Sequence, residues 1–466
     1  MSKNELEEPE TWAVETFGLA ELGDLRRTDR LVQLAAALAR DPQSSLPASL
    51  RGEAETVGAY RFLNNAALFP EQILMPHFVQ TRREAAKRAQ VLMIGDTTEC
   101  NLSSHHSVQG AGPVGRSSLA QGFFVHSVLA RDAQTEELLG CAYQQPFVRQ
   151  PAPEKETPGQ HNQRERESRV WEQSVRGIGP VPTGSQWIYV GDRGSDIFPF
   201  WQACQQLGYD FTIRVAQDRG IAGKESEPSD DPALLYLKSR ARQLLAQDVR
   251  LLALPATAGS PARDAVVEVS FEAVRIQPPI HNTTLEKTEL SLWVVRVWEP
   301  LPPAGVEPLE WILLTSVPVL TVTDAWEQAR WYRCRWLIEE FHKVLKSGCR
   351  LEDRRMHTVS ALENLLAILT PIGMRLLRLR DLARLAPDLP ATQIVSQEIV
   401  NVVAELSQRP QGVWTVRDLC CAMARFGGFL ARKCDGLPGW QTLWKGWVFV
   451  QTVLLGVHLA ALLPPS

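Results

Sequence analysis

Two short apolar segments that each end in Gly-Asp constrain the fold of this chain more than any other feature. They are VLMIGD at 91–96 and WIYVGD at 187–192. Apolar runs of this length, bounded by turn residues, are typical of buried strands. A helical pattern, FPFWQACQQLG, follows the second segment, and YDFTIRV at 209–215 predicts a further strand after it. Because strands that alternate with helices build a largely parallel sheet, we predict an α/β core.

The regions that flank this core have different patterns. Residues 11 to about 70 are predicted to be helical, because LVQLAAALAR and EAETVGAYRFL have helical apolar spacing. Strand-like segments between Pro-rich and Gly-rich turns predict a β-rich insertion at about 220–318, and the chain is predicted to be helical from there to its C-terminus. A length of 466 residues allows about three domains. We place them at 1–70, 71–370 and 371–466.

Charge and cysteine usage exclude several classes of protein. Lys plus Arg number 49 against 53 Asp plus Glu, so the net charge of −4 excludes a protein that coats nucleic acid by bulk positive charge. Eight cysteines without a C-x-x-C pair indicate neither a disulfide framework nor structural zinc. The acidic start MSKNELEEPE has no signal-peptide pattern, and polar residues interrupt the apolar run 447–463. We therefore expect a cytoplasmic protein with no membrane span.

Asp96 and Asp192 stand where two predicted apolar strands end. Ligands gather at strand ends in an open α/β sheet, and carboxylate oxygens suit Mg²⁺. Two such carboxylates and a third acid can hold two metal ions about 3.5–4 Å apart, which stabilises the in-line displacement of a phosphoryl group. The alternative is that each aspartate only caps the turn or helix that follows it.

The candidate for the third acid lies on a helix predicted over 326–347. At about 100° per residue, one arc of roughly 60° along about 21 Å of this helix carries four polar side chains. They are Tyr332, Arg335, Glu339 and Lys346. Such a stripe suits a metal-bridged phosphodiester, with Glu339 on the metal and the two cations on phosphate oxygens. A solvated helix face with an Arg335–Glu339 ion pair is the alternative.

The segment YRCRWLIEEFHKVLK has the spacing Tyr-x2-Arg-x3-Glu-x6-Lys. Other characteristic segments accompany it in order along the chain: LGDLRRTDRL, GAYRF, GDTT, FFVHSVL, GDRGSD, FTIR, WILLTSVPV and MARFGGFLARK. The ordered set resembles the bacterial cut-and-paste DDE transposases of the transposon Tn-five group, and the resemblance covers nearly the whole chain.

This resemblance implies a fold and a chemistry. The fold would be an RNase H-like α/β catalytic core with a β-rich insertion, between an N-terminal helical DNA-binding domain and a C-terminal helical dimerisation domain. Asp96, Asp192 and Glu339 would be the catalytic carboxylates that bind Mg²⁺, for which Mn²⁺ can substitute. The implied reaction is nicking at a transposon end, hairpin formation and opening, and strand transfer into target DNA.

The resemblance also implies which residues touch DNA within the active site. Tyr332, Arg335 and Lys346 would hold the phosphates next to the cut, and Arg214 would make a further contact. These side chains supply a phenol, two guanidinium groups and an ammonium, all of which donate hydrogen bonds to phosphate oxygens.

Two tryptophans and three arginines complete the set of implied DNA contacts. Trp311 and Trp336 match positions around a flipped base, with Trp311 as the stacking surface. The alternative for both rings is a core role. Arg26, Arg27 and Arg30 resemble the segment that recognises the transposon ends, since arginine suits phosphates and guanine edges alike. The alternative for these arginines is a solubilising surface face.

The expected partners are double-stranded DNA, as inverted ends and as target, and a second copy of the chain in the DNA complex. The expected location is the bacterial cytoplasm beside the nucleoid. Two other functions stay open: a metal-dependent DNA nuclease that never joins DNA, and a non-catalytic DNA-binding inhibitor of transposition. The three intact acids favour an enzyme over the inhibitor.

Overall fold

The two Gly-Asp segments form neighbouring parallel strands in the computed structural model of the chain. Strand β1 is Gln90–Asn101 and β5 is Gln186–Gly191. They pair in parallel from Gln90 and Gln186 to Ile94 and Val190. Helix α8, Phe198–Leu207, leads from β5 to β6, Asp210–Arg214, which pairs in parallel with β5. The prediction of a mixed α/β fold is therefore confirmed.

The structure describes residues 9–50, 52–105, 107–115, 119–149, 167–222, 236–254, 263–279, 289–409, 412–432 and 436–462. The chain divides into two compact units, which are described one at a time. Unit 1 comprises Met1–Ala85, Thr97–Ala152 and Glu339–Ser466. Unit 2 comprises Ala86–Asp96 and Pro153–Ile338. Strand β1 and helix α11, Trp336–Lys343, each begin in unit 2 and end in unit 1.

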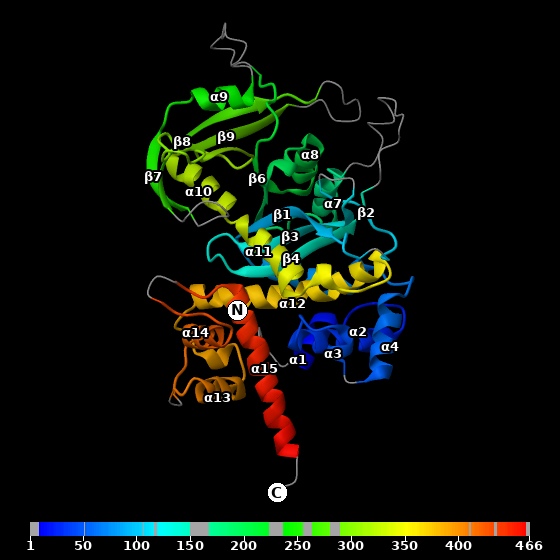
Figure 1. The fold of residues 1–466 in the computed structure, drawn as a ribbon. Coiled ribbons are helices and arrows are strands. Elements are labelled where there is room, and N and C mark those ends of the chain that lie inside the picture. Colours follow the sequence, from blue (N-terminus) through cyan, green and yellow to red (C-terminus); the bar gives the residue numbers. More distant parts are fainter. Residues whose placement is uncertain are drawn as a thin grey trace. The chain divides into compact units, whose positions relative to one another are not determined.

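Unit 2 is built on a sheet with the strand order β1-β5-β6-β10-β9-β8-β7. The strands within the predicted β-rich insertion are β7 Asp248–Leu254, β8 Arg263–Ile276, β9 Leu290–Trp298 and β10 Glu310–Thr315. They pair antiparallel, and β10 pairs antiparallel with β6. The insertion thus extends the parallel strands into one mixed sheet (Figure 1).

The other helices of unit 2 are α7 Arg169–Ile178, α9 Leu237–Gln243 and α10 Val322–Arg333. Helix α10 begins at a reciprocal cap, in which Thr321 and Asp324 each accept a backbone N–H of the other. Its Trp326 donates a hydrogen bond from Nε1 to Asp248 at 2.7 Å, which ties the helix to β7. The same bond lowers the pKa of the Asp248 carboxyl, because it stabilises the ionised form.

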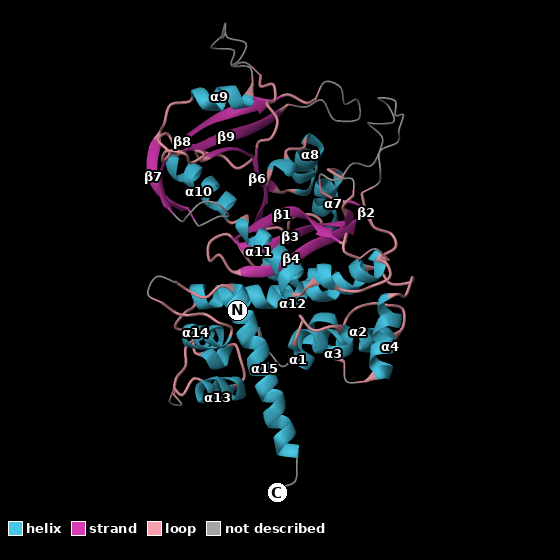
Figure 2. Cartoon of the chain, viewed as in Figure 1, coloured by secondary structure: helices cyan, strands magenta, loops and turns pink. Residues whose placement is uncertain are grey.

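Unit 1 is mostly helical, as the secondary-structure colouring shows (Figure 2). Its helices are α1 Pro9–Phe17, α2 Leu25–Arg40, α3 Leu46–Ser49, α4 Glu53–Leu63, α5 Pro70–Ala86, α12 Val359–Leu385, α13 Gln397–Leu406, α14 Val416–Phe426 and α15 Trp440–Leu462. Its strands are β2 Gly112–Pro113, β3 Gln121–Asp132 and β4 Leu138–Phe147, which pair antiparallel. The helical N-terminal region predicted from the sequence is confirmed.

Helix α12 covers β4 within unit 1. Thr370 donates to the Gln144 side chain at 2.7 Å, and Nε of Arg378 donates to the Leu138 carbonyl at 3.1 Å. By length and hydropathy, α12 and residues Trp440–Ala460 of α15 could each cross a membrane. The most apolar stretch of α12 is 89% buried in protein, whereas that of α15 is 33% buried. The burial of α12 is that of a core helix.

The prediction of a single helix over 326–347 is wrong. Helix α10 ends at Arg333, and the backbone then makes short three-residue hydrogen bonds from Leu337 to Cys334 and from Ile338 to Arg335. After α11, residues Val344–Gly348 form a wider π-helical turn. A three-residue hydrogen-bond spacing turns the chain by more per residue than an α-helix does, and a five-residue spacing turns it by less. The four side chains of the predicted stripe therefore do not share one α-helical face.

Candidate functional site

Asp96 and Asp192 stand at equivalent positions relative to two paired strands of unit 2. Because Ile94 lies opposite Val190 in the parallel register, each aspartate stands two residues beyond that pair. Asp192 follows the last residue of β5 directly, as predicted. Asp96 does not end its strand, because β1 continues to Asn101. Both aspartates are half-buried, at the point where β1 changes from fully buried to partly exposed.

The glycine before each aspartate is required by a close contact. A Cβ atom at Gly95 would come within 2.2 Å of the Tyr189 hydroxyl, which belongs to β5. A Cβ atom at Gly191 would come within 2.3 Å of the Ser195 hydroxyl. Side chains at these two positions would push the neighbouring strand or turn away, so the Gly-Asp pairs serve the packing around the aspartates.

The turn after β5 fixes the backbone of Asp192. Its Oδ1 accepts the N–H of Gly194 at 2.7 Å, which caps the 3-10 turn Arg193–Ser195. The Ser195 hydroxyl donates to the Asp192 carbonyl at 2.6 Å. The capping role considered for this aspartate is therefore present. It occupies one lone pair of Oδ1, and a carboxylate offers about four acceptor positions.

Arg335 joins the predicted DNA-binding segment to Asp96. Its Nη1 lies 2.8 Å from Oδ2 of Asp96, and the two side chains are 14% and 16% exposed. The guanidinium also lies 6.0 Å from the ring of Tyr332, which packs edge-on against Trp311 at 5.3 Å. Asp96, Arg335, Tyr332 and Trp311 thus form one contact chain in unit 2. Asp96 and Arg335 also have further interactions.

The two tryptophans differ in exposure. Trp311 on β10 is 9% exposed, so its ring is largely enclosed by protein. Trp336 at the start of α11 is 45% exposed. The core role considered for both rings therefore fits Trp311, whereas Trp336 presents much of its surface to solvent.

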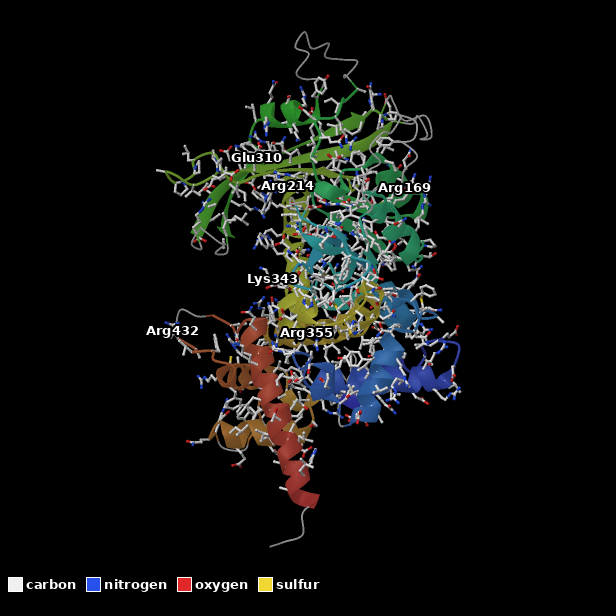
Figure 3. All side chains as sticks on the ribbon, turned by 45° about the vertical axis from the view of Figure 1, so that its right-hand side comes forward. Arg169, Arg214, Glu310, Lys343, Arg355 and Arg432 are labelled. Atoms are coloured by element: carbon white, nitrogen blue, oxygen red, sulfur yellow. The ribbon has the colours of Figure 1, made fainter. Side chains whose placement is uncertain are left out.

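Arg214 ends β6 and is held by the neighbouring strand β10. Its Nη2 donates to the Glu310 carbonyl at 2.9 Å, and Figure 3 labels both residues. The Glu310 carboxylate pairs with Arg242 at 2.6 Å and with Arg296 at 2.9 Å. Arg242, followed by Arg296, holds the pKa of Glu310 below its usual value. Arg242 and Arg296 thus share one carboxylate, whereas Arg214 is held by a backbone carbonyl.

Glu339 and Lys346 lie in unit 1, beyond the start of α11. Glu339 is half-buried in the first turn of that helix and has partners of its own. Lys346 lies in the π-helical turn, where its Nζ is 3.8 Å from Oε1 of Glu352. The same Glu352 oxygen accepts the backbone N–H of Asn101, the last residue of β1, at 2.9 Å. Lys346 is therefore 24% exposed beside the end of that strand.

The aspartate pair has the chemistry of a hard-cation site, since both members offer carboxylate oxygens at the same end of two paired strands. Glu339, the third predicted ligand, belongs to unit 1. Within the described ranges, the structure gathers no group of three or more His, Cys, Asp or Glu side chains at metal-binding distances. The assignment of these three acids as metal ligands stays a prediction.

The three N-terminal arginines open helix α2, in unit 1. Arg26 is 90% exposed along its side chain and pairs with Asp24, the helix N-cap, at 2.8 Å. Arg27 is half-buried, and its Nη1 donates to the Leu22 carbonyl at 2.9 Å. Arg30 is also half-buried. Its guanidinium lies against Gly58 of α4 and lines a cavity of about 220 Å³. Of the three, only Arg26 is fully presented to solvent.

Two contacts beside the aspartates involve residues that were not among the predicted site residues. Thr97 follows Asp96, and its hydroxyl is 2.8 Å from Nδ1 of His126 on β3. Burial lowers the pKa of His126 to about 3, so the ring is neutral at physiological pH. The other contact joins Asp196 to Arg219 in unit 2. His126 lies in the segment FFVHSVL and Asp196 in GDRGSD, so these segments could have pointed to both residues. Neither segment reveals that His126 contacts Thr97 or that Asp196 pairs with Arg219.

Two family models match this chain. Residues 9–68 match the family described as Transposase DNA-binding, and residues 160–372 match the Transposase DDE domain. Asp192 and Glu339 lie inside the second match, and Asp96 precedes it. The chain is also similar to a cryo-EM structure of a piggyBac transposase synaptic complex with hairpin DNA. That similarity has a TM-score of 0.35 and 10% identity, and covers 98% of this chain and 77% of the other. At that score it establishes no shared fold.

Proposed function

We propose that this chain, which carries a transposase DNA-binding domain and a transposase DDE domain, is a DDE transposase that excises DNA between inverted ends and joins it to target DNA. The observation that carries the proposal is the 2.8 Å ion pair of Arg335 with Asp96, beside the strand that leads to Asp192. It brings the arginine of the Tyr-Arg-Glu-Lys segment to one carboxylate of the predicted site. Phosphoryl transfer on DNA needs both, because carboxylates hold cations and guanidinium groups hold phosphates.

The spacing of Tyr332, Arg335, Glu339 and Lys346 supports a finer assignment to the Tn-five group. In this assignment, the catalytic core is RNase H-like. Strands β1, β5 and β6, which are parallel neighbours, are its central strands, and the strands that follow β6 carry the insertion.

Mg²⁺ is the cofactor that the donor set favours, and Mn²⁺ can replace it. Asp96, Asp192 and Glu339 would hold it, since all three offer hard oxygen ligands. The metal supplies Lewis-acid stabilisation of the attacking and leaving oxygens. Arg335 and Tyr332 then position a phosphate next to Asp96, with Arg214 from β6 and Lys346 beside the end of β1 as further cationic contacts.

The reaction sequence uses one site several times. Water first cleaves one strand at the transposon end and leaves a 3′ hydroxyl. That hydroxyl attacks the opposite strand, so a hairpin forms on the transposon end and flanking DNA leaves. Water reopens the hairpin, and the 3′ hydroxyl finally attacks target DNA. Each step is a phosphoryl transfer in which only the nucleophile and leaving group change, so no covalent protein–DNA intermediate is required.

A homodimer in the cytoplasm is the expected working form, because two transposon ends have to be held together before excision. The far end of α15 supports it. Leu455, Val457 and Leu459 are 43%, 48% and 55% exposed, which leaves an apolar helix surface open to a partner.

The decisive experiment uses the full chain with Mg²⁺, a donor fragment and a target plasmid. The donor is built from the inverted repeats in the DNA that flanks the gene. We expect joined product from the wild type, and none from Asp96→Asn, Asp192→Asn or Glu339→Ala, although these variants should still bind the ends. Asp264→Asn, an exposed acid on β8, is the control and should retain activity.

Cleavage without a joined product would replace the transposase with a nuclease. End binding without cleavage by the wild type would replace it with a DNA-binding inhibitor. Cleavage that survives Glu339→Ala would contradict the assigned role of that residue.

A further inference from the structure

Asp196 is a buried acid whose two carboxylate oxygens both accept hydrogen bonds. Its side chain is 1% exposed. One oxygen accepts the backbone N–H groups of Ala216 and Gln217, both at 2.7 Å. The other accepts Nε of Arg219 at 2.9 Å, and Nη2 of the same arginine donates to the Asp196 carbonyl at 2.6 Å. All of these donors come from the loop that follows β6.

These hydrogen bonds of Asp196 with Ala216, Gln217 and Arg219, which we call the Asp196 clamp, join the ends of two neighbouring parallel strands. Asp196 closes the 3-10 turn that Asp192 begins, so the two aspartates are the two caps of one short turn. Ala216 lies two residues after Arg214, the end of β6, and Gly191 lies opposite Ile213 in the register of β5 and β6. The loop with Asp192 and the loop after Arg214 are therefore tied together by one buried carboxylate.

Trp201 on α8 holds the arginine of the clamp in place. The Arg219 guanidinium carbon lies 4.6 Å from the centroid of the Trp201 ring, and Arg219 is 10% exposed along its side chain. The ring nitrogen of Trp201 donates to the Ser195 carbonyl at 3.2 Å. The stacked ring thus supports Arg219 on one side and the turn of Asp192 on the other.

A buried ion pair is a costly way to achieve stability alone, because apolar side chains of the same size often stabilise a fold as well. What the pair supplies is geometry, since its hydrogen bonds are directional and permit one arrangement of the two loops. We propose that Asp196, acting through Arg219, is a positioning residue that sets the carboxylate of Asp192 and the end of β6 for the reaction. This inference rests on the proposed function.

The test compares this pair with a matched pair elsewhere in unit 2. Arg263 and Glu299 form a similarly buried ion pair in the β-rich insertion, at 19% and 3% side-chain exposure. Asp196→Asn, Arg219→Lys and the control Glu299→Gln are measured for thermal unfolding, end binding, single-turnover cleavage and Mn²⁺ affinity. The Mn²⁺ affinity is read by electron paramagnetic resonance on the protein–DNA complex, which reports metal binding without turnover.

We expect Asp196→Asn and Arg219→Lys to weaken Mn²⁺ binding and to slow cleavage, each by about 10–100-fold, with end binding retained. Glu299→Gln should lower the melting temperature but leave both site readouts near wild type. If Asp196→Asn does not fold, Arg219→Lys carries the test, because it keeps the charge and loses only the fork geometry.

The positioning role is overturned if both variants bind Mn²⁺ and cleave like the wild type. It is also overturned if Glu299→Gln reduces cleavage and Mn²⁺ affinity as much as they do, since the effect would then be loss of stability. A wild-type chain that binds Mn²⁺ but cuts no donor overturns the proposed function instead, and the Mn²⁺ affinities of the variants still decide the positioning role.

Discussion

Nη1 of Arg335 lies 2.8 Å from Oδ2 of Asp96, although the two residues are 239 positions apart in the sequence. Neither side chain is more than 16% exposed, so water screens this pair only weakly. The pair is where a strand of the α/β sheet meets the segment that follows α10. A guanidinium there can neutralise the carboxylate and hold a phosphate beside it.

Replacing Arg335 with lysine should reduce cleavage by about tenfold or more, because a charge-assisted hydrogen bond contributes about 1.5–3 kcal/mol and lysine lacks the fork. Arg296→Lys is the control. Arg296 is also 14% exposed and pairs with Glu310 in the same unit. Both variants should lose similar stability in denaturant titrations. Equal cleavage rates for the two would contradict a specific role for Arg335.

Arg26 and Arg27 should differ when each is replaced with alanine. Arg26 is exposed and pairs with the cap Asp24, so Arg26→Ala should weaken end binding and reduce its dependence on salt concentration by about one phosphate contact. Arg27 holds the Leu22 carbonyl, so Arg27→Ala should also lower stability by about 1 kcal/mol. Binding isotherms at several salt concentrations and thermal melts separate the two effects. Unchanged end binding in Arg26→Ala would count against recognition by this helix.

Unit 1 should lose stability in mild acid. Burial lowers the pKa values of His77 and His126 to about 3, from an ordinary value of 6.5. The unfolded chain then binds protons that the folded chain does not, so stability is complete above pH 6.5 and falls as the pH drops toward 3. At pH 5.5 each ring should lower the free energy of unfolding by about 1 kcal/mol.

Denaturant titrations at pH 7.5 and 5.5 measure this loss. His126→Gln should reduce the difference between the two pH values, whereas His357→Gln, at an exposed position, should not. A wild type with the same stability at both pH values would show that the buried rings are not the cause.

Trp336→Ala should slow the hairpin step while the fold stays intact. The ring is 45% exposed, so it can stack on an unstacked base, and such stacking contributes about 1–3 kcal/mol of binding free energy per base.

Trp311 is 9% exposed, so Trp311→Ala should lower the free energy of unfolding by about 3–5 kcal/mol. Trp311→Phe is therefore the better test of the part that this ring plays in the reaction. Gels of single-turnover reactions resolve nicked and hairpin products. Normal hairpin yield from Trp336→Ala would leave the stacking role to Trp311 alone.

Much of the architecture was predictable because local sequence patterns specify it. The apolar runs of the Gly-Asp segments lie in β1 and β5, the predicted β-rich insertion contains β7 to β10, and EAETVGAYRFL forms α4 without a shift in its bounds. Periodicity and turn residues act over a few positions, so they can be read from the chain. The helix over 326–347 was mispredicted because the three-residue turn at Arg335 and the π-helical turn at Val344 leave no mark in apolar spacing.

By itself, the sequence determined most of the strands and helices, the positions of Asp96 and Asp192 relative to the apolar runs, and the spacing that points to a DDE transposase. Only the tertiary structure decided that Arg335 pairs with Asp96, that Asp196 ties the loop of Asp192 to the loop after β6, and that Trp311 is enclosed whereas Trp336 is exposed. The reason is physical. Local patterns reflect backbone geometry, whereas these pairings depend on which distant segments pack together, and that is settled only when the whole core is formed.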